Sequence, residues 1–316
     1  HVPGQPPYRP DNHDFTYQGY QTVRANLNTS RNIPAVKALE AASPEAVAEK
    51  ARELGYDVMP YYAMALGSYE VTPLQHTAAM AAFANGGIYT EPYFIERVED
   101  ADGNVLYDAA PTSARVWSEQ TAYIMLDMLH GNVVDRDPAY GLSNRAEVPG
   151  RWVAGKTGTT NNEVDLWYVG FTPGLVASVW IGYDHSRGMP SRMTNSDGST
   201  EIVTSSRQPI YVWNDFVTGA LQGSSGAAQF PVPPGIVFHQ IDLKTGALSP
   251  SGVRAAFRES DDLSAQALGQ SVKLNLPIDT ATGQRATADT PPDRIEIIEV
   301  DPADVGQYLQ GAGGGG

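Results

Sequence analysis

The segment VAGKTGTT, residues 153–160, is the most informative part of this sequence. It is a short apolar run that ends in Lys156, carries glycines on both sides of that lysine and continues into hydroxyl side chains. Two interpretations fit it. One is a phosphate-binding loop, because residues 150–157 match G-x-x-x-x-G-K-[ST] letter for letter. The other is a strand that presents Lys156 to a peptide.

A phosphate loop needs a buried strand before its first glycine and a helix directly after its last hydroxyl. Residues 144–149 read NRAEVP, with three polar side chains and a final proline, which does not fit a buried strand. Residues 151–154 favour a strand where a loop is required. Gly158, two threonines and two asparagines then indicate a turn. The pattern match is therefore interpreted as accidental, and the nucleotide-binding alternative is kept for the structure to test.

The strand interpretation accounts for the glycines. Gly155 and Gly158 inside a strand mark a place where another backbone comes close. A peptide could then be added along the strand edge through main-chain hydrogen bonds. Lys156 would supply positive charge there, and Thr157 and Thr159 would supply hydroxyls for a carboxylate. An ordinary exposed strand end that carries a lysine fits the same residues.

The composition of the whole chain limits the classes of function. The chain has 316 residues, 41% of them hydrophobic, which is enough for one large domain and a smaller one. Its formal charge of −15 argues against nucleic acid as a partner. It has no cysteine, which excludes disulfides, thiolate metal sites and cysteine nucleophiles. We expect no metal and no cofactor.

The ends of the chain suggest a piece of a longer protein. The sequence begins at His1 without an initiator methionine and shows no signal peptide. No apolar run approaches the roughly 20 residues that span a bilayer. We therefore expect that segments upstream of His1 belong to the same protein.

Periodicity and capping residues predict the elements around the central stretch. Ser30 and Asn32 are expected on a loop between two helices, and His76 is expected in a core or surface role rather than in catalysis. Strands at 166–172 and 175–183 should join the strand at 153–159 as three antiparallel neighbours. A hairpin is expected at 94–107 around Asp102-Gly103. Helices are expected at residues 22–28, from Pro34, from Ser43 to Gly55, at 72–84, at 118–130 with Gly131 as its cap, and at 209–221.

The composition shifts to Ser, Gly, Ala and Pro after Gly223, which indicates a linker. We therefore expect a first domain at 1–223 and an appendage with a tail at 224–316. Residues 241–246 and 278–283 are related, and each is predicted to be a strand that ends in a turn whose aspartate binds backbone amides. The appendage should therefore be small and β-rich.

Taken together, the motifs resemble one family. Ser30-Arg31-Asn32 is an S-x-N element, and Lys156-Thr157-Gly158 follows 126 positions later. The order of blocks resembles the transpeptidase domain of class A penicillin-binding proteins, from about Tyr8 to Leu221. The resemblance implies an α/β (α+β) fold, with an antiparallel central sheet flanked by helices and an all-helical subdomain. The further matching blocks lie at residues 10–12, 19–25, 30–36, 66–68, 71–74, 83–87 and 165–170.

The resemblance also implies a function. Such enzymes cross-link peptidoglycan in the bacterial envelope, outside the cytoplasmic membrane. A serine attacks the D-alanyl-D-alanine end of a stem peptide, and an amine of a neighbouring stem takes the acyl group. The expected ligands are thus peptidoglycan stem peptides and β-lactams, which mimic them. In the family a glycosyltransferase domain and a membrane helix lie upstream.

Family roles carry over residue by residue. Ser30 resembles the serine that relays a proton to the leaving nitrogen, and the amide of Asn32 can donate to and accept from the substrate. Lys156 orients Ser30 and attracts the substrate carboxylate. Thr157 and Thr159, with Gly158 between them, bind that carboxylate. The backbone N–H of Thr159 resembles half of an oxyanion hole, whose loss costs about 3 kcal/mol of barrier.

One departure from the family is large: the nucleophile lies in S-x-x-K, and no lysine of this chain has serine three positions before it. That segment is therefore expected upstream of His1, so this chain alone should be inactive. A catalytically inactive scaffold that binds peptidoglycan remains an alternative, and a serine β-lactamase would share the fold. Residues 205–208 also depart from the family, which affects the expected loop shape. The five lysines are Lys37, Lys50, Lys156, Lys244 and Lys273, preceded at that spacing by Pro34, Val47, Val153, Ile241 and Gln270.

Overall fold

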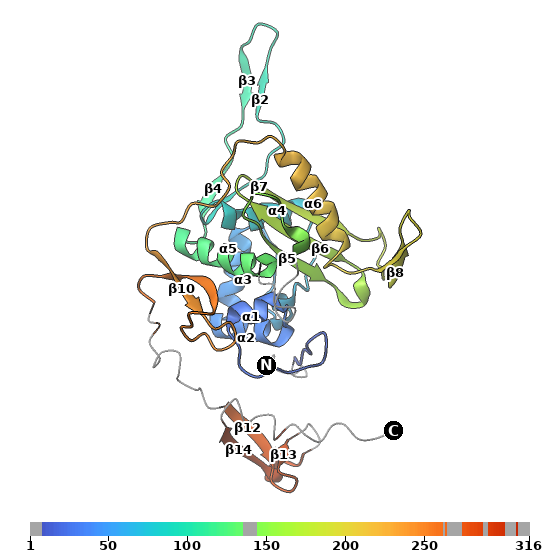
Figure 1. The fold of residues 1–316 in the computed structure, drawn as a ribbon, viewed down its shortest axis with the longest axis vertical. Helices are drawn as coiled ribbons and strands as arrows, with labels where there is room; N and C mark the ends of the chain where they lie inside the picture. Colours follow the sequence, from blue (N-terminus) through green and yellow to red (C-terminus); the bar gives the residue numbers. More distant parts are fainter. Residues whose placement is uncertain are drawn as a thin grey trace.

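The structure is a computed structural model that describes residues 8–134, 144–261, 263, 274–286, 290–300 and 308. Its centre is a three-stranded antiparallel sheet of order β5-β6-β7 (Figure 1). The strands are β5 (Ala154–Thr159), β6 (Leu166–Thr172) and β7 (Leu175–Ile181). Pro173-Gly174 makes the tight turn between β6 and β7, and Gly174 has a φ of 84°. The predicted sheet is confirmed.

The phosphate-loop alternative is wrong. Lys156 and Thr157 lie in the middle of β5 and pair with Val169 and Tyr168 of β6. After β5 the chain makes only a short 3₁₀ turn, Asn161–Glu163, before it enters β6. A helix N-terminus facing the glycines is therefore missing from this described part of the chain, and with it the anion site that such a loop requires.

Helices cover both faces of the sheet. On one face, Trp213 and Val217 of α6 (Gln208–Leu221) pack with Tyr168. On the other face, α5 (Glu119–Val134) and α4 (Pro73–Ala84) pack against Val169 and Phe171 (Figure 1). The side chains of β5 therefore alternate between the two faces of the sheet, buried at Ala154 and progressively more exposed toward Thr159.

Glycines in the sheet leave room for aromatic side chains. A Cβ at Gly155 would overlap the hydroxyl of Tyr168, and a Cβ at Gly170 would overlap the ring of Trp213. The sequence interpretation expected another backbone near Gly155, and that expectation is wrong in detail. The neighbour is a tyrosine side chain of the adjacent strand, and Tyr168 itself is fully buried.

A helical subdomain lies beside the sheet, and its sequence explains its helix starts. Thr72 and Gln75 form a reciprocal capping box at α4, and Ser43 accepts a hydrogen bond from Ala46 at the start of α3. Ala48, Leu54 and other apolar side chains form its core. The elements are α1 (Val23–Asn28), α2 (Asn32–Ala42), α3 (Pro44–Glu53), η1 (Tyr62–Leu66) and α4.

Two details of the helix predictions are wrong. Asn32 is the first residue of α2 rather than a loop residue, because the helix begins two positions before Pro34. Gly131 does not cap α5, which continues to Val134. The extra turn buries Asn132 and Val133, and that burial offsets the low helix propensity of glycine.

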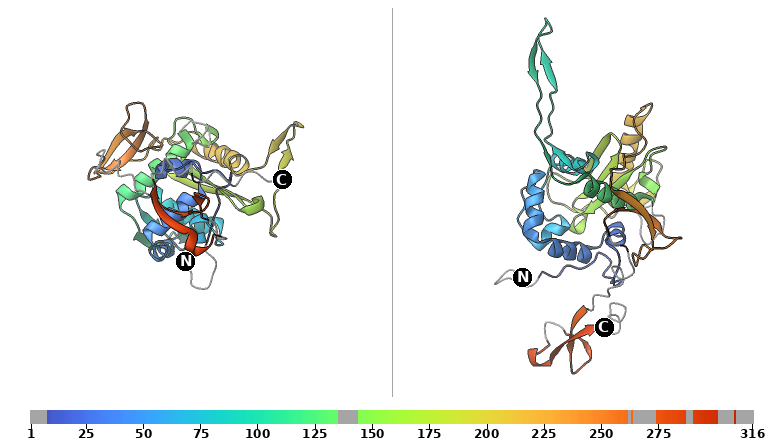
Figure 2. Two further views of the ribbon diagram at one scale, coloured as in Figure 1. Left: turned by 90° about the horizontal axis from the view of Figure 1, so that it is seen from below. Right: turned by 90° about the vertical axis from the view of Figure 1, so that its left-hand side faces the viewer.

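Two hairpins leave the body of the molecule (Figures 1 and 2). The first joins β2 (Arg97–Glu99) to β3 (Val105–Asp108), and the predicted hairpin is confirmed with shorter strands. Its base is the pair β1 (Ile88–Thr90) and β4 (Ser113–Arg115). The second hairpin joins β8 (Arg192–Thr194) to β9 (Thr200–Ile202) between the sheet and α6.

A buried ion pair links distant parts of the chain. Arg24 of α1 donates to Asp127 of α5 at 2.6 Å, and the same carboxylate accepts the backbone N–H of Ala256 at 3.0 Å. Ala256 belongs to β11 (Val253–Arg258), which pairs with β10 (Ile236–Ile241). The β10–β11 hairpin therefore packs on α5, so contacts cross the domain boundary predicted at 223.

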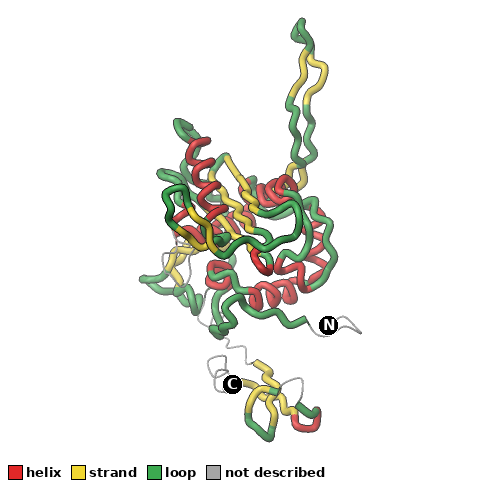
Figure 3. Tube along the Cα trace, turned by 90° about the vertical axis from the view of Figure 1, so that its right-hand side faces the viewer, coloured by secondary structure: helices red, strands yellow, loops and turns green. Residues whose placement is uncertain are grey.

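A small three-stranded sheet of order β13-β12-β14 follows. Figure 3 shows it as the yellow strands beside the label C. The predicted aspartate turns are confirmed in both sheets. Asp242 accepts the N–H of Thr245 at 2.7 Å, and Asp279 accepts that of Ala281 at 2.9 Å. In the described ranges, no helix combines the length and the apolar character needed to cross a bilayer. The strands are β12 (Leu274–Asp279), β13 (Gln284–Arg285) and β14 (Ile295–Val300).

Candidate active site

Two predicted site residues that lie 126 positions apart meet in space. Lys156 Nζ donates to Ser30 Oγ at 2.8 Å and to the carbonyl of Thr157 at 3.0 Å. Ser30 is exposed in the turn between α1 and α2, and Lys156 is half-buried in β5. The contact therefore joins the helical subdomain to the central sheet at a point that solvent can reach.

The turn that carries Ser30 has an unusual backbone. Ser30 has a φ of 53°, in the left-handed region that few non-glycine residues adopt. The end of α1 holds it there: Ser30 N–H donates to Leu27, and Arg31 N–H donates to Asn26. Such conformations persist where the surrounding structure fixes them, and they cluster at functional sites.

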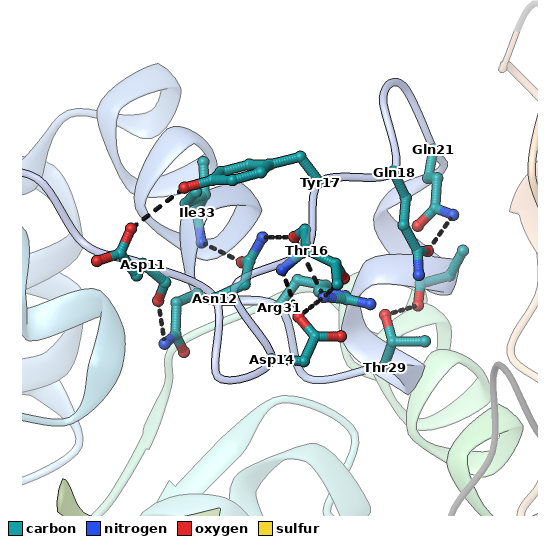
Figure 4. A network of polar contacts seen from close by, with 12 residues as sticks. Asp11, Asn12, Asp14, Thr16, Tyr17, Gln18, Gln21, Thr29, Arg31 and Ile33 are labelled. Carbon is teal, nitrogen blue, oxygen red and sulfur yellow. Dashed lines mark hydrogen bonds and ion pairs between the residues drawn. The ribbon is translucent and has the colours of Figure 1, made fainter. Parts of the chain in front are cut away.

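Residues 11–17 form hydrogen bonds with residues 31–33, which follow Ser30 directly (Figure 4). Arg31 donates to Asp14 at 2.5 Å, and Asn12 accepts the N–H of Ile33 at 3.2 Å. Hydrogen bonds from Thr16 and Arg31 hold the pKa of the Asp14 carboxyl at about 2. The side chain of Asn32 donates to the Asp11 carbonyl at 2.7 Å, so its amide is directed at this segment.

Burial lowers the pKa of the Lys156 ammonium from 10.5 to about 8. The cause is desolvation, because removal from water penalises the charged form. An amine with a pKa near 8 exchanges protons readily close to neutral pH. Lys156 can therefore hold the Ser30 hydroxyl in place and also give or take a proton through it.

The backbone of β5 is paired on one side only. His130 contacts the carbonyl of Val153 at 2.5 Å, and Asn132 donates to that of Gly155 at 3.1 Å. Both carbonyls thus point away from β6, and by alternation so do the N–H and C=O groups of Thr157 and Thr159. Within the described residues, no donor or acceptor meets the N–H of Thr157 or Thr159. The second half of this edge is open.

The structure separates the other predicted residues by face. Lys156 and Gly158 share the face that looks toward Ser30, whereas the side chains of Thr157 and Thr159 point to the opposite face. The Thr159 hydroxyl lies 2.5 Å from that of Ser205. Of Thr157 and Thr159, only the backbone groups and not the side chains therefore lie at the same open edge as the Lys156–Ser30 pair.

Two supporting residues were not predicted, and a third, His76, was expected only in a core or surface role. His130 and Asn132 bind the first half of β5, and two polar residues late in an apolar helix were the available signal. The His76 ring nitrogen Nδ1 lies 2.9 Å from the Tyr56 hydroxyl, to which it is hydrogen-bonded. The His76 ring also packs edge-on against Trp167, with the ring centroids 5.3 Å apart. Trp167 is the partner of Gly158 in the sheet. His76 thus packs behind the second half of β5, through Trp167. Burial lowers the pKa of the His76 imidazole.

Comparison with known proteins identifies the family of this chain. Residues 1–205 match the model of the penicillin binding protein transpeptidase domain. The chain is 38% identical over 209 residues to penicillin-binding protein 1A of Aquifex aeolicus, which covers 66% of this chain and 27% of that protein. It is 32% identical to penicillin-binding protein 1A of Rickettsia bellii, over 81% of this chain and 34% of that one. The chain thus spans about a third or less of the length of these relatives.

Solved structures give the same answer. Penicillin-binding protein 1A from Haemophilus influenzae superposes with a TM-score of 0.70 at 27% identity, over 84% of this chain and 44% of that one. PonA1 of Mycobacterium tuberculosis, in complex with penicillin V, superposes with a TM-score of 0.57 at 26% identity, over 71% and 65%. With the family model covering most of the chain, this protein belongs to the penicillin-binding protein transpeptidase domain family.

Proposed function

We propose that this chain forms most of a D,D-transpeptidase domain that cross-links peptidoglycan stem peptides through a serine acyl-enzyme. The observation that carries the proposal is the 2.8 Å contact between Lys156 Nζ and Ser30 Oγ beside an open strand edge. A stem peptide can pair with that edge in an extended conformation. We assign the nucleophilic serine to an S-x-x-K segment outside this chain.

The proposed steps balance as follows. The serine oxygen attacks the carbonyl carbon of the penultimate D-alanine, and the bond from that carbon to the nitrogen of the last D-alanine breaks. The proton lost by the serine reaches the leaving nitrogen through the Ser30 hydroxyl, with Lys156 holding that hydroxyl in line. An amine of a second stem then attacks the acyl-enzyme, loses a proton and restores the serine.

Each remaining residue has a proposed part in these steps. The N–H of Thr159 stabilises the oxyanion as one half of the hole, a task that needs a fixed donor without a protein partner. Lys156 attracts the terminal carboxylate, and the hydroxyls of Thr157 and Thr159 bind it after a change of side-chain orientation. Asn32 binds the substrate amide once its own amide leaves Asp11. We place the enzyme in the bacterial envelope, held by a membrane helix upstream.

Covalent labelling with a fluorescent penicillin tests the proposal. The parent protein should label, and label should be lost when excess unlabelled penicillin competes. The present chain alone should not label. Lys156→Ala in the parent should slow labelling strongly, whereas Lys50→Ala should not, because Lys50 lies on α3 in an exposed pair with Glu53.

The alternatives predict other results. A catalytically inactive scaffold would bind stem peptides without any covalent label on the parent. A β-lactamase would label and then release the hydrolysed penicillin within minutes. Either result would contradict the proposed transpeptidase.

A further inference from the structure

The hairpin that projects from the body, here called the arm, spans residues 91–112 (Figures 1 and 2). It is fixed at its base, where β1 pairs with β4 and Glu91 N–H donates to Thr112. It is also ordered at its tip. The Asp100 carboxylate accepts the N–H groups of Asp102 and Asn104, and Gly103 takes a φ of 82° in the turn. Hydrogen bonds at both the base and the tip therefore give the arm a defined conformation.

The arm exposes large apolar side chains. Phe94 is 86% exposed, and Tyr93, Ile95 and Tyr107 are each about half exposed. With Val98 these side chains line one shallow depression, here called the arm patch. Val98 and Tyr107 are direct partners on β2 and β3, so they share a face. Contiguous apolar surface of this kind marks an interaction site in soluble proteins.

Folding does not account for the arm patch. None of the hydrophobic clusters formed by the described residues includes a residue of the patch. A two-stranded hairpin gains little stability from side chains that remain in water. Five large apolar residues along the fixed arm therefore have no role in the hydrophobic cores that the described residues form.

The charge around the patch indicates what covers it. Between residues 91 and 108 the chain carries six carboxylates and one arginine. That arginine, Arg97, is paired with Glu99 at 2.6 Å. The rim of the patch is therefore strongly acidic. A surface of the opposite sign would be steered toward it, and a surface of the same sign would be repelled. The carboxylates are Glu91, Glu96, Glu99, Asp100, Asp102 and Asp108.

We propose that the arm patch is a docking site for a protein that presents apolar side chains flanked by lysine or arginine. A second copy of this chain is disfavoured, because its formal charge is −15 and a symmetric contact would bring the acidic rims together. An anionic lipid surface is disfavoured for the same reason. The outer edges of β2 and β3 pair with no other strand among the described residues, so the partner can add a strand there.

The test uses the full chain and two fluorescent 14-residue peptides as probes, one alternating Lys with Leu and one alternating Glu with Leu. Fluorescence anisotropy should give at least about tenfold tighter binding to the Lys-Leu peptide. The double change Phe94→Ser and Ile95→Ser, which keeps the charge, should weaken that binding about tenfold, as loss of a central apolar anchor does. Phe216→Ser, an exposed aromatic on α6, is the matched control and should change nothing.

The contribution of the acidic rim is tested by comparing two double substitutions to lysine, one on the arm and one away from it. Glu96→Lys with Asp102→Lys should weaken binding of the Lys-Leu peptide, whereas Glu40→Lys with Glu49→Lys on α2 and α3 should change it much less. Equal loss in both pairs would mean attraction to net charge alone and would overturn the site. Self-association lost in the Phe94/Ile95 variant, binding to phosphatidylglycerol vesicles through the same residues, or no binding of the Lys-Leu peptide would each overturn the proposal as well.

Discussion

The two halves of β5 differ in whether the backbone groups on the edge away from β6 have hydrogen-bond partners. In the first half, α5 closes the edge: His130 and Asn132 take the carbonyls of Val153 and Gly155. In the second half, the N–H groups of Thr157 and Thr159 point to the same side and meet none of the described residues. Lys156, at the junction, reaches Ser30. One strand thus combines a fixed anchor with an open ligand edge, and changes in the two halves should have different consequences.

The largest effect is expected at the junction. Lys156→Ala in the parent protein should reduce the rate of β-lactam acylation by about 10²–10⁴-fold, the usual range for loss of a group that positions and moves a proton. Stability to urea should not fall, because the desolvated ammonium of Lys156 opposes folding at neutral pH and alanine removes that penalty. Stopped-flow labelling and urea melts measure the two quantities. A large loss of stability with an unchanged acylation rate would reverse the assignment.

Substitutions in the first half of β5, or in the α5 residues that bind it, should mainly lower the free energy of unfolding. Asn132→Ala removes the donor to Gly155 and leaves a buried carbonyl unpaired, which should lower the free energy of unfolding by about 1–3 kcal/mol. Gly155→Ala should cost a similar amount, because the added methyl meets Tyr168. Asn85→Ala at the exposed end of α4 is a milder control. Wild-type stability in both closed-half variants would show that this edge is not an anchor.

The lowered pKa of Lys156 makes a pH prediction whose sign follows from proton binding. Between pH 8 and 10.5 the unfolded chain binds more protons at this lysine than the folded chain, so its folding penalty is relieved as pH rises through that window. Compared with Lys156→Met, the wild type should therefore gain stability from pH 7.5 to pH 10. Lys50→Met serves as the control. A gain that is equal in wild type and Lys156→Met would contradict the lowered pKa.

The smallest effect is expected below the open half, at His76. Burial lowers its pKa, so below pH 6.5 the unfolded state binds the proton more readily and the folded state loses stability. From pH 7 to pH 5 the wild type should lose more stability than His76→Gln. Because His76 packs on Trp167 opposite Gly158, acylation should fall over the same range. Identical pH profiles for the two proteins would exclude this support.

The sheet was predicted well because its signals are local, whereas the Ser30–Lys156 pairing was predicted only through the family resemblance. The Pro173-Gly174 turn and the alternating strands need no distant information, and the S-x-N and K-T-G blocks carry a family resemblance. The length of α5 was missed, because Gly131 is a good helix end by propensity and continues only through tertiary burial. The reason for Gly155 was missed for the same cause: it depends on the rotamer of Tyr168 on another strand.

A crystal structure of the penicillin-treated parent protein tests the central claim most directly. We predict an acyl group beside the second half of β5, with its carbonyl oxygen on the N–H of Thr159 and with Lys156 still in contact with Ser30. The first half should keep its bonds to His130 and Asn132. An acyl group bound away from this edge, or Ser30 and Lys156 lying apart on opposite sides of a closed groove, would contradict the claim.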